Sequence, residues 1–187
     1  MIGILPKSIE INGKEEPIRT DFRDILVIFS AFNDEELSPQ EKYMVCLTIF
    51  YKNFQNMNED NYEEAYAKAI DFLTLGIKDK DNDTPKLMDW EQDEALVFSA
   101  VNKVAGVEVR ALDYVHWWTF MGYYTAISDS LFSEVVNIRA KRQKGKKLEA
   151  NELDFYRKNK DMVDLKIRYT REEIKEREEI KKMLGIE

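Results

Sequence analysis

The chain has 187 residues, of which 44% are hydrophobic and 34% are charged, with only 7 Gly and 4 Pro. This composition excludes a disordered or collagen-like chain and indicates a helix-rich globular protein of about one domain. The single cysteine, Cys46, excludes an intramolecular disulfide, and its apolar surroundings in MVCLTIFY indicate a buried thiol rather than a nucleophile.

The net charge of −8 is unevenly distributed. Residues 1–138 contain 12 basic and 25 acidic residues, whereas residues 139–187 contain 16 basic and 11 acidic residues, so an acidic body precedes a basic C-terminal arm. The start, MIGILPKSIE, lacks the features of a signal peptide, and no apolar run reaches the roughly 18–20 residues that cross a bilayer. We therefore expect a soluble, cytosolic protein with no membrane partner.

The N-terminal segment SIEINGKEEPIR predicts a β-hairpin. Isoleucines alternate with polar residues on either side of Asn12-Gly13, a pair that favours a two-residue turn with positive φ angles. Pro17 lacks a backbone donor, which predicts an edge strand there.

Two helices are predicted between residues 22 and 50. Apolar residues at helical spacing predict the first, with Thr20 or Asp21 as its N-cap. The second opens with SPQE, in which Ser38 caps the helix and Glu41 completes a capping box.

A third helix is predicted from NYEE, with Asn61 as its N-cap and Glu64 reaching back to it. The following segment, KDKDNDTPK at residues 78–86, has no apolar side chain and predicts a solvated loop. Its acids do not fit an EF-hand, because Thr84 replaces the required glycine and Trp90 the required glutamate.

Further helices are predicted towards the C-terminus. One ends near Gly106, the next contains residues 113–124, and another is capped by Ser128 or Ser130 and becomes basic at its end. A last helical segment begins near Asn151 and is expected to run towards residue 184.

The stretch DYVHWWTFMGYY, residues 113–124, contains the only histidine of the chain. On a helix it is apolar nearly all round, which predicts a helix surrounded by others. A zinc site needs three or four ligands at recognisable spacing, and no motif resembles a nucleophile elbow. We therefore expect a structural His116, no catalytic residue, no metal and no cofactor, with these residues in the core: Tyr114, Trp117, Trp118, Phe120, Met121 and Tyr124.

The segment RAKRQKGKK, residues 139–147, holds six basic residues and no acid. It is either a solvated loop or a surface that docks against an acidic face of a sister subunit or client. We do not expect nucleic acid as the partner, because the acidic body repels a duplex and no aromatic residue interleaves the basic ones. The candidate partner-binding residues are Arg139, Lys141, Arg142, Lys144, Lys146 and Lys147.

Residues 166–187 form a charged tail with isoleucines near heptad spacing. The apolar turns are too few to secure a coiled coil, so a solvated helix and a partner-binding helix both remain open. We expect a mainly α (α+β) fold: a helical domain with an N-terminal hairpin at residues 1–165, followed by this extended helical tail.

Three blocks carry a family resemblance: LPKSIEINGKEEPIRTDFRDIL, DWEQDEALVFSAVNKVAGVEVRALDYVHWWTF, and SLFSEVVNIRAKR followed by FYRKNKDM. In this order they resemble the bacteriophage gene-product-fifteen family of tailed phages and prophages of Gram-positive bacteria. The resemblance covers most of residues 4–165, with HWW as its most distinctive part, and leaves the tail uncovered.

The resemblance implies a non-enzymatic tail assembly chaperone in the host cell cytoplasm. Such a protein coats the tape-measure protein, keeps it soluble and delivers it to the tail tube protein, and it also associates with itself. The resemblance brings no catalytic residues. Two alternatives stay open: a structural tail or connector component retained in the virion, and a small host-takeover or nucleic-acid-binding phage protein.

Overall fold

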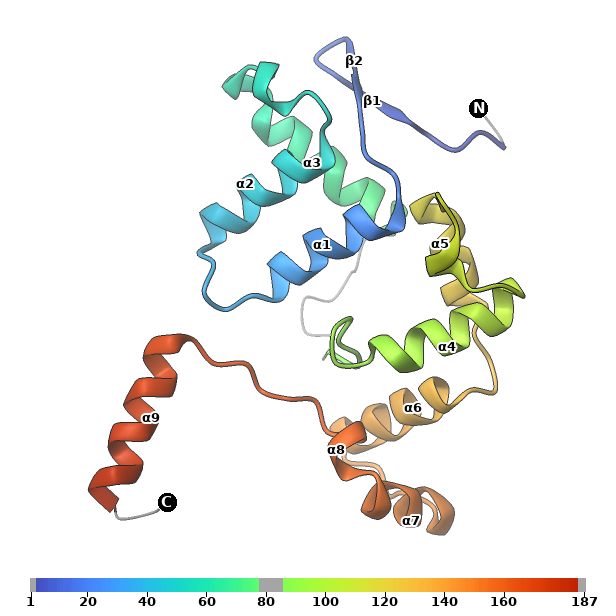
Figure 1. Ribbon diagram of the computed structural model, residues 1–187, viewed down its shortest axis with the longest axis vertical. Helices are drawn as coiled ribbons and strands as arrows, with labels where there is room; N and C mark the ends of the chain where they lie inside the picture. The colour runs from blue at the N-terminus through green and yellow to red at the C-terminus, as the bar shows by residue number, and fades with distance from the viewer. Residues whose placement is uncertain (1–2, 78–85, 185–187) are drawn as a thin grey trace.

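A computed structural model of the chain describes residues 3–77 and 86–184 and confirms a mainly helical fold with a small N-terminal hairpin (Figure 1). The predicted charged loop at residues 78–86 falls almost entirely outside the described residues. The elements follow in the order β1 (Ser8–Ile11), β2 (Lys14–Pro17), α1 (Phe22–Asn33), α2 (Pro39–Phe50), η1 (Phe54–Asn56), η2 (Glu59–Asn61), α3 (Tyr62–Leu73), α4 (Glu94–Ala105), η3 (Val109–Ala111), α5 (Trp117–Thr125), α6 (Leu131–Gln143), α7 (Ala150–Lys158), α8 (Lys160–Val163) and α9 (Arg171–Leu184).

The hairpin has the predicted turn. Strands β1 and β2 pair antiparallel, and Asn12 and Gly13 between them have φ angles of 47° and 76°. Positive φ at both positions matches the twist of the two strands, which is why Asn-Gly suits this turn. The hairpin packs on α3: Lys68 Nζ donates to the Glu10 carbonyl, and the Asn12 N–H donates to Glu64.

The starts of α1 and α2 confirm two predicted caps. The Asp21 side chain accepts from the N–H of Arg23, and Ser38 and Glu41 form both halves of the capping box. Each cap supplies acceptors for N–H groups that the first turn of a helix leaves without partners.

The predicted cap of α3 is wrong. Asn61 makes no side-chain capping bond, and Glu64 accepts from the hairpin instead of reaching back. The chain enters α3 through the 3₁₀ turn η2, whose own cap is Asn58, accepting from the N–H of Asp60. Asn61 therefore already has near-helical backbone angles and cannot adopt the extended geometry of an N-cap.

The main core lies between α1, α2, α3, α4 and α5 and is rich in aromatic rings. Phe22 and Phe120 stack with ring centres 4.7 Å apart, and Trp117 stacks on Phe120 at 5.8 Å. The indole N–H of Trp117 donates to the Leu73 carbonyl, so its polar tip is satisfied inside the core. A second, smaller cluster of Val135, Ile138 and Val163 joins α6 to α8.

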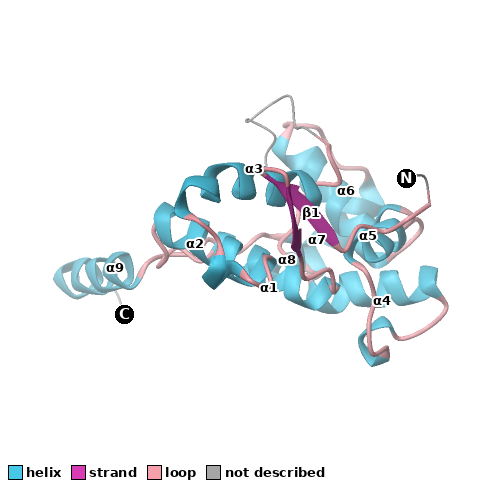
Figure 2. Cartoon of the chain, turned by 90° about the horizontal axis from the view of Figure 1, so that it is seen from above, coloured by secondary structure: helices cyan, strands magenta, loops and turns pink. Residues whose placement is uncertain are grey.

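One helix was expected from near Asn151 towards residue 184, and this prediction is wrong. Helix α7 ends at Lys158, the short α8 follows, and residues 164–170 are extended before α9 begins. The extended residues are held by Gln92 of the segment before α4, which donates to the Asp164 carbonyl and accepts from the Lys166 N–H. These tertiary bonds replace helical ones, and α9 consequently stands at the far end of an extended link (Figures 1 and 2).

Candidate functional site

His116 has a structural position at the start of α5. Its Nδ1 accepts from the N–H of Trp118 at 3.0 Å, which makes it the N-cap, and its Nε2 lies 3.0 Å from the carbonyl oxygen of Pro6. Burial lowers the pKa of the imidazole, although the bond to Pro6 opposes this effect. Since the cap needs an unprotonated Nδ1, the neutral ring suits this position and ties the N-terminal segment to the core.

The predicted core residues have different degrees of burial. Trp117 and Phe120 are fully buried, and Trp118, Met121 and Tyr124 are half-buried against the same core. The prediction is wrong for Tyr114, which is 48% exposed and bonds Thr20 through its hydroxyl. Helix α5 begins only at Trp117, so the helical spacing that predicted a buried Tyr114 does not apply to it.

Metal-ligating side chains do not form a binding group in the part of the chain that the structure describes. No group of three or more His, Cys, Asp or Glu side chains there could hold a metal ion. Cys46 is fully buried, and burial raises the pKa of its thiol to about 12.

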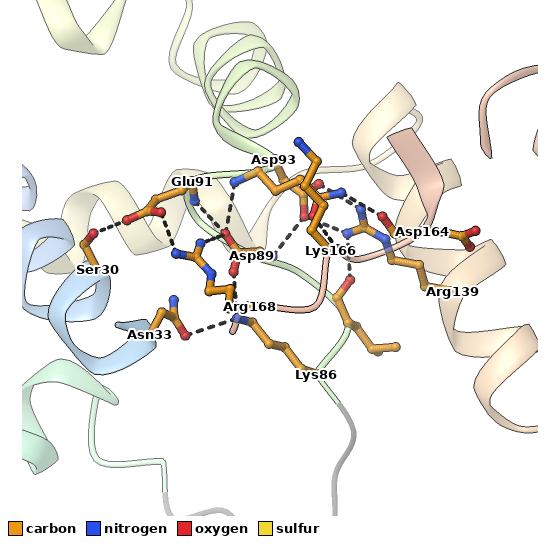
Figure 3. A network of polar contacts seen from close by, with 12 residues as sticks. Ser30, Asn33, Lys86, Asp89, Glu91, Asp93, Arg139, Asp164, Lys166 and Arg168 are labelled. Carbon is orange, nitrogen blue, oxygen red and sulfur yellow. Dashed lines mark hydrogen bonds and ion pairs between the residues drawn. The ribbon is translucent and has the colours of Figure 1, made fainter. Parts of the chain in front are cut away.

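Arg139, predicted to contact a partner, is instead buried, so that prediction is wrong. It follows Ile138 and lies one turn after Val135, on the face of α6 that packs inward. Its guanidinium forms a two-bond ion pair with Asp93, with N–O distances of 2.6 and 2.9 Å, and the two side chains are 4% and 1% exposed (Figure 3).

The remaining donors of Arg139 are also satisfied. They reach three backbone carbonyls: Leu87, Met162 and Val163. Because Arg139 lies on α6 and its partners lie on α8 and in the segment before α4, this one side chain joins three parts of the fold. Asp93 in turn accepts from the Asp89 N–H at 3.0 Å, which extends the network to the next acid.

Asp89 is the second centre of this network and tethers the extended link before α9. It accepts from Lys86 at 2.7 Å and from Arg168 at 2.9 Å, and Arg168 also pairs with Glu91 at 2.8 Å (Figure 3). Burial alone would raise the pKa of Asp89, but hydrogen bonds from Lys86 and from the backbone, with the nearby positive charges, hold it well below its usual range. Glu91 also accepts from Ser30, so the link is anchored on α1 as well.

The other basic residues of the segment divide into two groups. Lys141 pairs with the largely buried Glu152 at 2.5 Å, and Arg142 pairs with Asp164 and covers the ring of Tyr156. Lys144, Lys146 and Lys147 are exposed. Contact of this segment with a partner stays a prediction, and its exposed basic side chains are these three lysines and Arg142.

The family comparison agrees with the resemblance seen in the sequence. The model of the bacteriophage Gp15 protein family matches residues 1–165. The chain belongs to this family. No curated protein and no solved structure matches it.

The acids that hold Arg139 and Arg168 in this phage protein were not predicted from its sequence. A usable signal was present: a basic residue at position 139 shares a helical face with Val135 and Ile138, so an acid had to meet it in the core. The acids of DWEQD, which are Asp89, Glu91 and Asp93, have i, i+2 and i+4 spacing and so offer several carboxylates to one neighbourhood. Within residues 3–77 and 86–184, no helix combines the length and apolar character needed to span a bilayer.

Proposed function

We propose that this phage protein is a non-enzymatic tail assembly chaperone in the host cytoplasm. It binds the tape-measure protein, keeps it soluble and promotes assembly of the tail tube around it. The observation that carries the proposal is membership of the bacteriophage Gp15 family over residues 1–165, together with the role that the resemblance implies.

The surface of the chain supports reversible binding of a long helical client. A chaperone that the tail tube must displace needs many weak contacts rather than one deep pocket. The link and α9 offer such contacts on a segment that extends from the helical body, since their apolar side chains are exposed: Ile167, Ile174, Ile180 and Met183. The exposed lysines 144, 146 and 147 add a positive patch near the end of α6.

The experiment is co-expression with the tape-measure protein of the same phage, followed by affinity capture and light scattering. We expect soluble tape-measure protein that co-elutes with several copies of this chain. Replacing Lys144, Lys146 and Lys147 together by Glu should reduce the captured amount and make binding less sensitive to salt. The matched control changes the net charge equally by replacing three exposed lysines elsewhere by Glu: Lys7, Lys52 and Lys160.

Two results would contradict the proposal. In one, the tape-measure protein precipitates whether or not this chain is present. In the other, mass spectrometry of purified particles finds this chain in fixed copy number, which is the behaviour of a retained tail or connector component. If the two triple variants reduce the captured amount equally, lysines 144, 146 and 147 are not part of the client surface. The capture of the tape-measure protein by the unchanged chain would still stand.

A further inference from the structure

The first half of the link to α9 is fixed to the helical body through its backbone. The side-chain amide of Gln92 donates to the Asp164 carbonyl and accepts from the Lys166 N–H, both at 2.9 Å. The next residue, Ile167, is 73% exposed, so its apolar side chain does not hold the chain to the body. Beyond Lys166 the attachment of the link therefore depends on polar side chains.

Arg168 makes the main polar contact of this second half. One nitrogen of its guanidinium lies 2.9 Å from Asp89, and the other lies 2.8 Å from Glu91 (Figure 3). The side chains of Arg168 and Glu91 are 32% and 48% exposed. Dissolved ions reach such a partly exposed pair, so salt weakens it.

Asp89 does not need Arg168 to remain satisfied inside the body. Its carboxylate also accepts from Lys86 at 2.7 Å and from the backbone N–H groups of Glu91 and Gln92, each at 3.0 Å. When Arg168 leaves, three donors stay with the buried carboxylate, and the guanidinium returns to water. The large cost of breaking a buried ion pair arises when one charge loses its only compensation, which is not the case here.

The start of α9 is stabilised by its own residues. The Thr170 N–H donates to the carboxylate of Glu173 at 2.8 Å, and the Glu173 N–H donates to the Thr170 hydroxyl at 3.2 Å, which is a capping box. The guanidinium of Arg177 lies over the ring of Tyr169 at 4.3 Å. Tyr169, Thr170 and α9 therefore form one unit.

The helical body gives this unit little other support. The side chains of residues 171–183 are all exposed. Glu36, in the turn between α1 and α2, accepts from the Arg171 N–H, but Glu36 is exposed as well, so water can replace that bond.

We propose that Arg168 is the latch of a hinged arm. While it is bound to Asp89 and Glu91, α9 keeps one direction; once it is released, α9 swings as a helix about Ile167 and Arg168, and the body stays folded. Ionic strength sets the released fraction. Since α9 has 14 residues and is about 21 Å long, its tip moves by a comparable distance.

The latch goes beyond the proposed function and needs no client. The arm lies outside residues 1–165, which the family model matches, whereas the two acids that hold it lie within them. The latch therefore connects an appendage of this chain to the domain that it shares with its family.

The test measures the distance between spin labels on α9 and α4 of the purified full chain by pulsed electron paramagnetic resonance. The labels are attached at Lys182→Cys and Ser99→Cys, two exposed positions, while the buried Cys46 stays unlabelled. At low salt we expect a narrow distribution of distances. In about 1 M salt, where the screening length is about 3 Å, the width should grow at least about twofold.

Substitutions identify Arg168 as the cause. Arg168→Gln should give the broad distribution already at low salt, and Glu91→Gln, which removes one of the two acids, should give an intermediate width. Arg157→Gln, the same change at an exposed arginine of α7, is the matched control and should keep the distribution narrow.

Urea unfolding followed by tryptophan fluorescence separates a latch from a contact that supports the fold. Arg168→Gln should unfold at the same urea concentration as the wild type, because Asp89 keeps its other three donors.

Three outcomes would overturn the proposal. The distribution could be equally broad in the wild type and in Arg168→Gln at low salt, in which case α9 is never fixed. It could stay narrow in Arg168→Gln, in which case other contacts hold α9. Arg168→Gln could also unfold at a clearly lower urea concentration, in which case release disturbs the body. Because no tape-measure protein is present, these outcomes leave the chaperone proposal untouched, and failure of client capture leaves this test untouched.

Discussion

Replacing Asp93 by Asn should strongly destabilise the fold. The change removes the negative charge that faces Arg139, while both side chains are almost completely buried. Breaking a buried ion pair by changing one partner costs about 3–5 kcal/mol, because the other charge is left without compensation. Three backbone carbonyls still accept from the guanidinium, so we expect a value near the low end, about 3 kcal/mol.

Arg139→Met should cost more, about 4–5 kcal/mol. It leaves the carboxylate of Asp93 in the interior with one backbone donor, and it also removes the donor from three carbonyls. The double variant should be less destabilised than the sum of the single changes, because no buried charge then remains without a partner.

Urea unfolding followed by tryptophan fluorescence and circular dichroism measures these free energies. For a chain of this length, a loss of about 3 kcal/mol lowers the Tm by about 6–12 °C. Lys158→Ala, which breaks the exposed pair with Asp154, is the control and should change the free energy of unfolding by less than about 0.5 kcal/mol. A loss of under about 1 kcal/mol in Asp93→Asn, or strict additivity in the double variant, would refute the coupling between Asp93 and Arg139.

Three further predictions concern single groups. Burial lowers the pKa of His116, so the fold favours the neutral imidazole. The stabilisation that depends on this neutral ring is complete above the ordinary pKa of about 6.5 and is lost as the pH falls below it, by at most about 1.4 kcal/mol of unfolding free energy per pH unit. This dependence on pH should be absent in His116→Asn when unfolding is measured from pH 7.5 to 5. Ser38→Ala removes the capping box with Glu41 and should lower the free energy of unfolding by about 1 kcal/mol in urea titrations, whereas Gln40→Ala should not. The thiol of Cys46, with its pKa raised to about 12, should resist a thiol-reactive dye at pH 8 and react fully in denaturant; rapid labelling of the native chain would contradict its burial.

Local signals predicted the elements whose ends are stabilised by their own residues. The Asn12-Gly13 turn and the capping box of Ser38 and Glu41 depend on atoms within a few residues of each other, so both can be predicted from the local sequence. The cap predicted at Asn61 failed because the hairpin, about fifty residues earlier, competes for Glu64. The helix expected to run from near Asn151 towards residue 184 is interrupted after Lys158, and Gln92 supplies bonds to the extended link that follows α8.

In the candidate site too, the local sequence predicted the residue types but not their surroundings. The basic segment at residues 139–147 was visible as a run of charge, but its six cations were indistinguishable until their surroundings were known. Arg139 faces inward against Asp93, whereas Lys144, Lys146 and Lys147 face solvent. Charge is a property of composition, but whether it is available to a partner depends on which face of α6 is covered.

Periodicity, turn chemistry and ordered motifs were enough to predict the mainly helical class, the hairpin turn, most of the aromatic core and the family. They could not predict that Arg139 joins α6, α8 and the segment before α4, or that Arg168 holds the link to α9, because both depend on contacts between distant segments. The ion pair of Arg139 with Asp93 joins residues 46 positions apart, and that of Arg168 with Asp89 joins residues 79 positions apart. Their stability comes from shared burial and from pairing of opposite charges, and neither exists until distant segments of the chain have met.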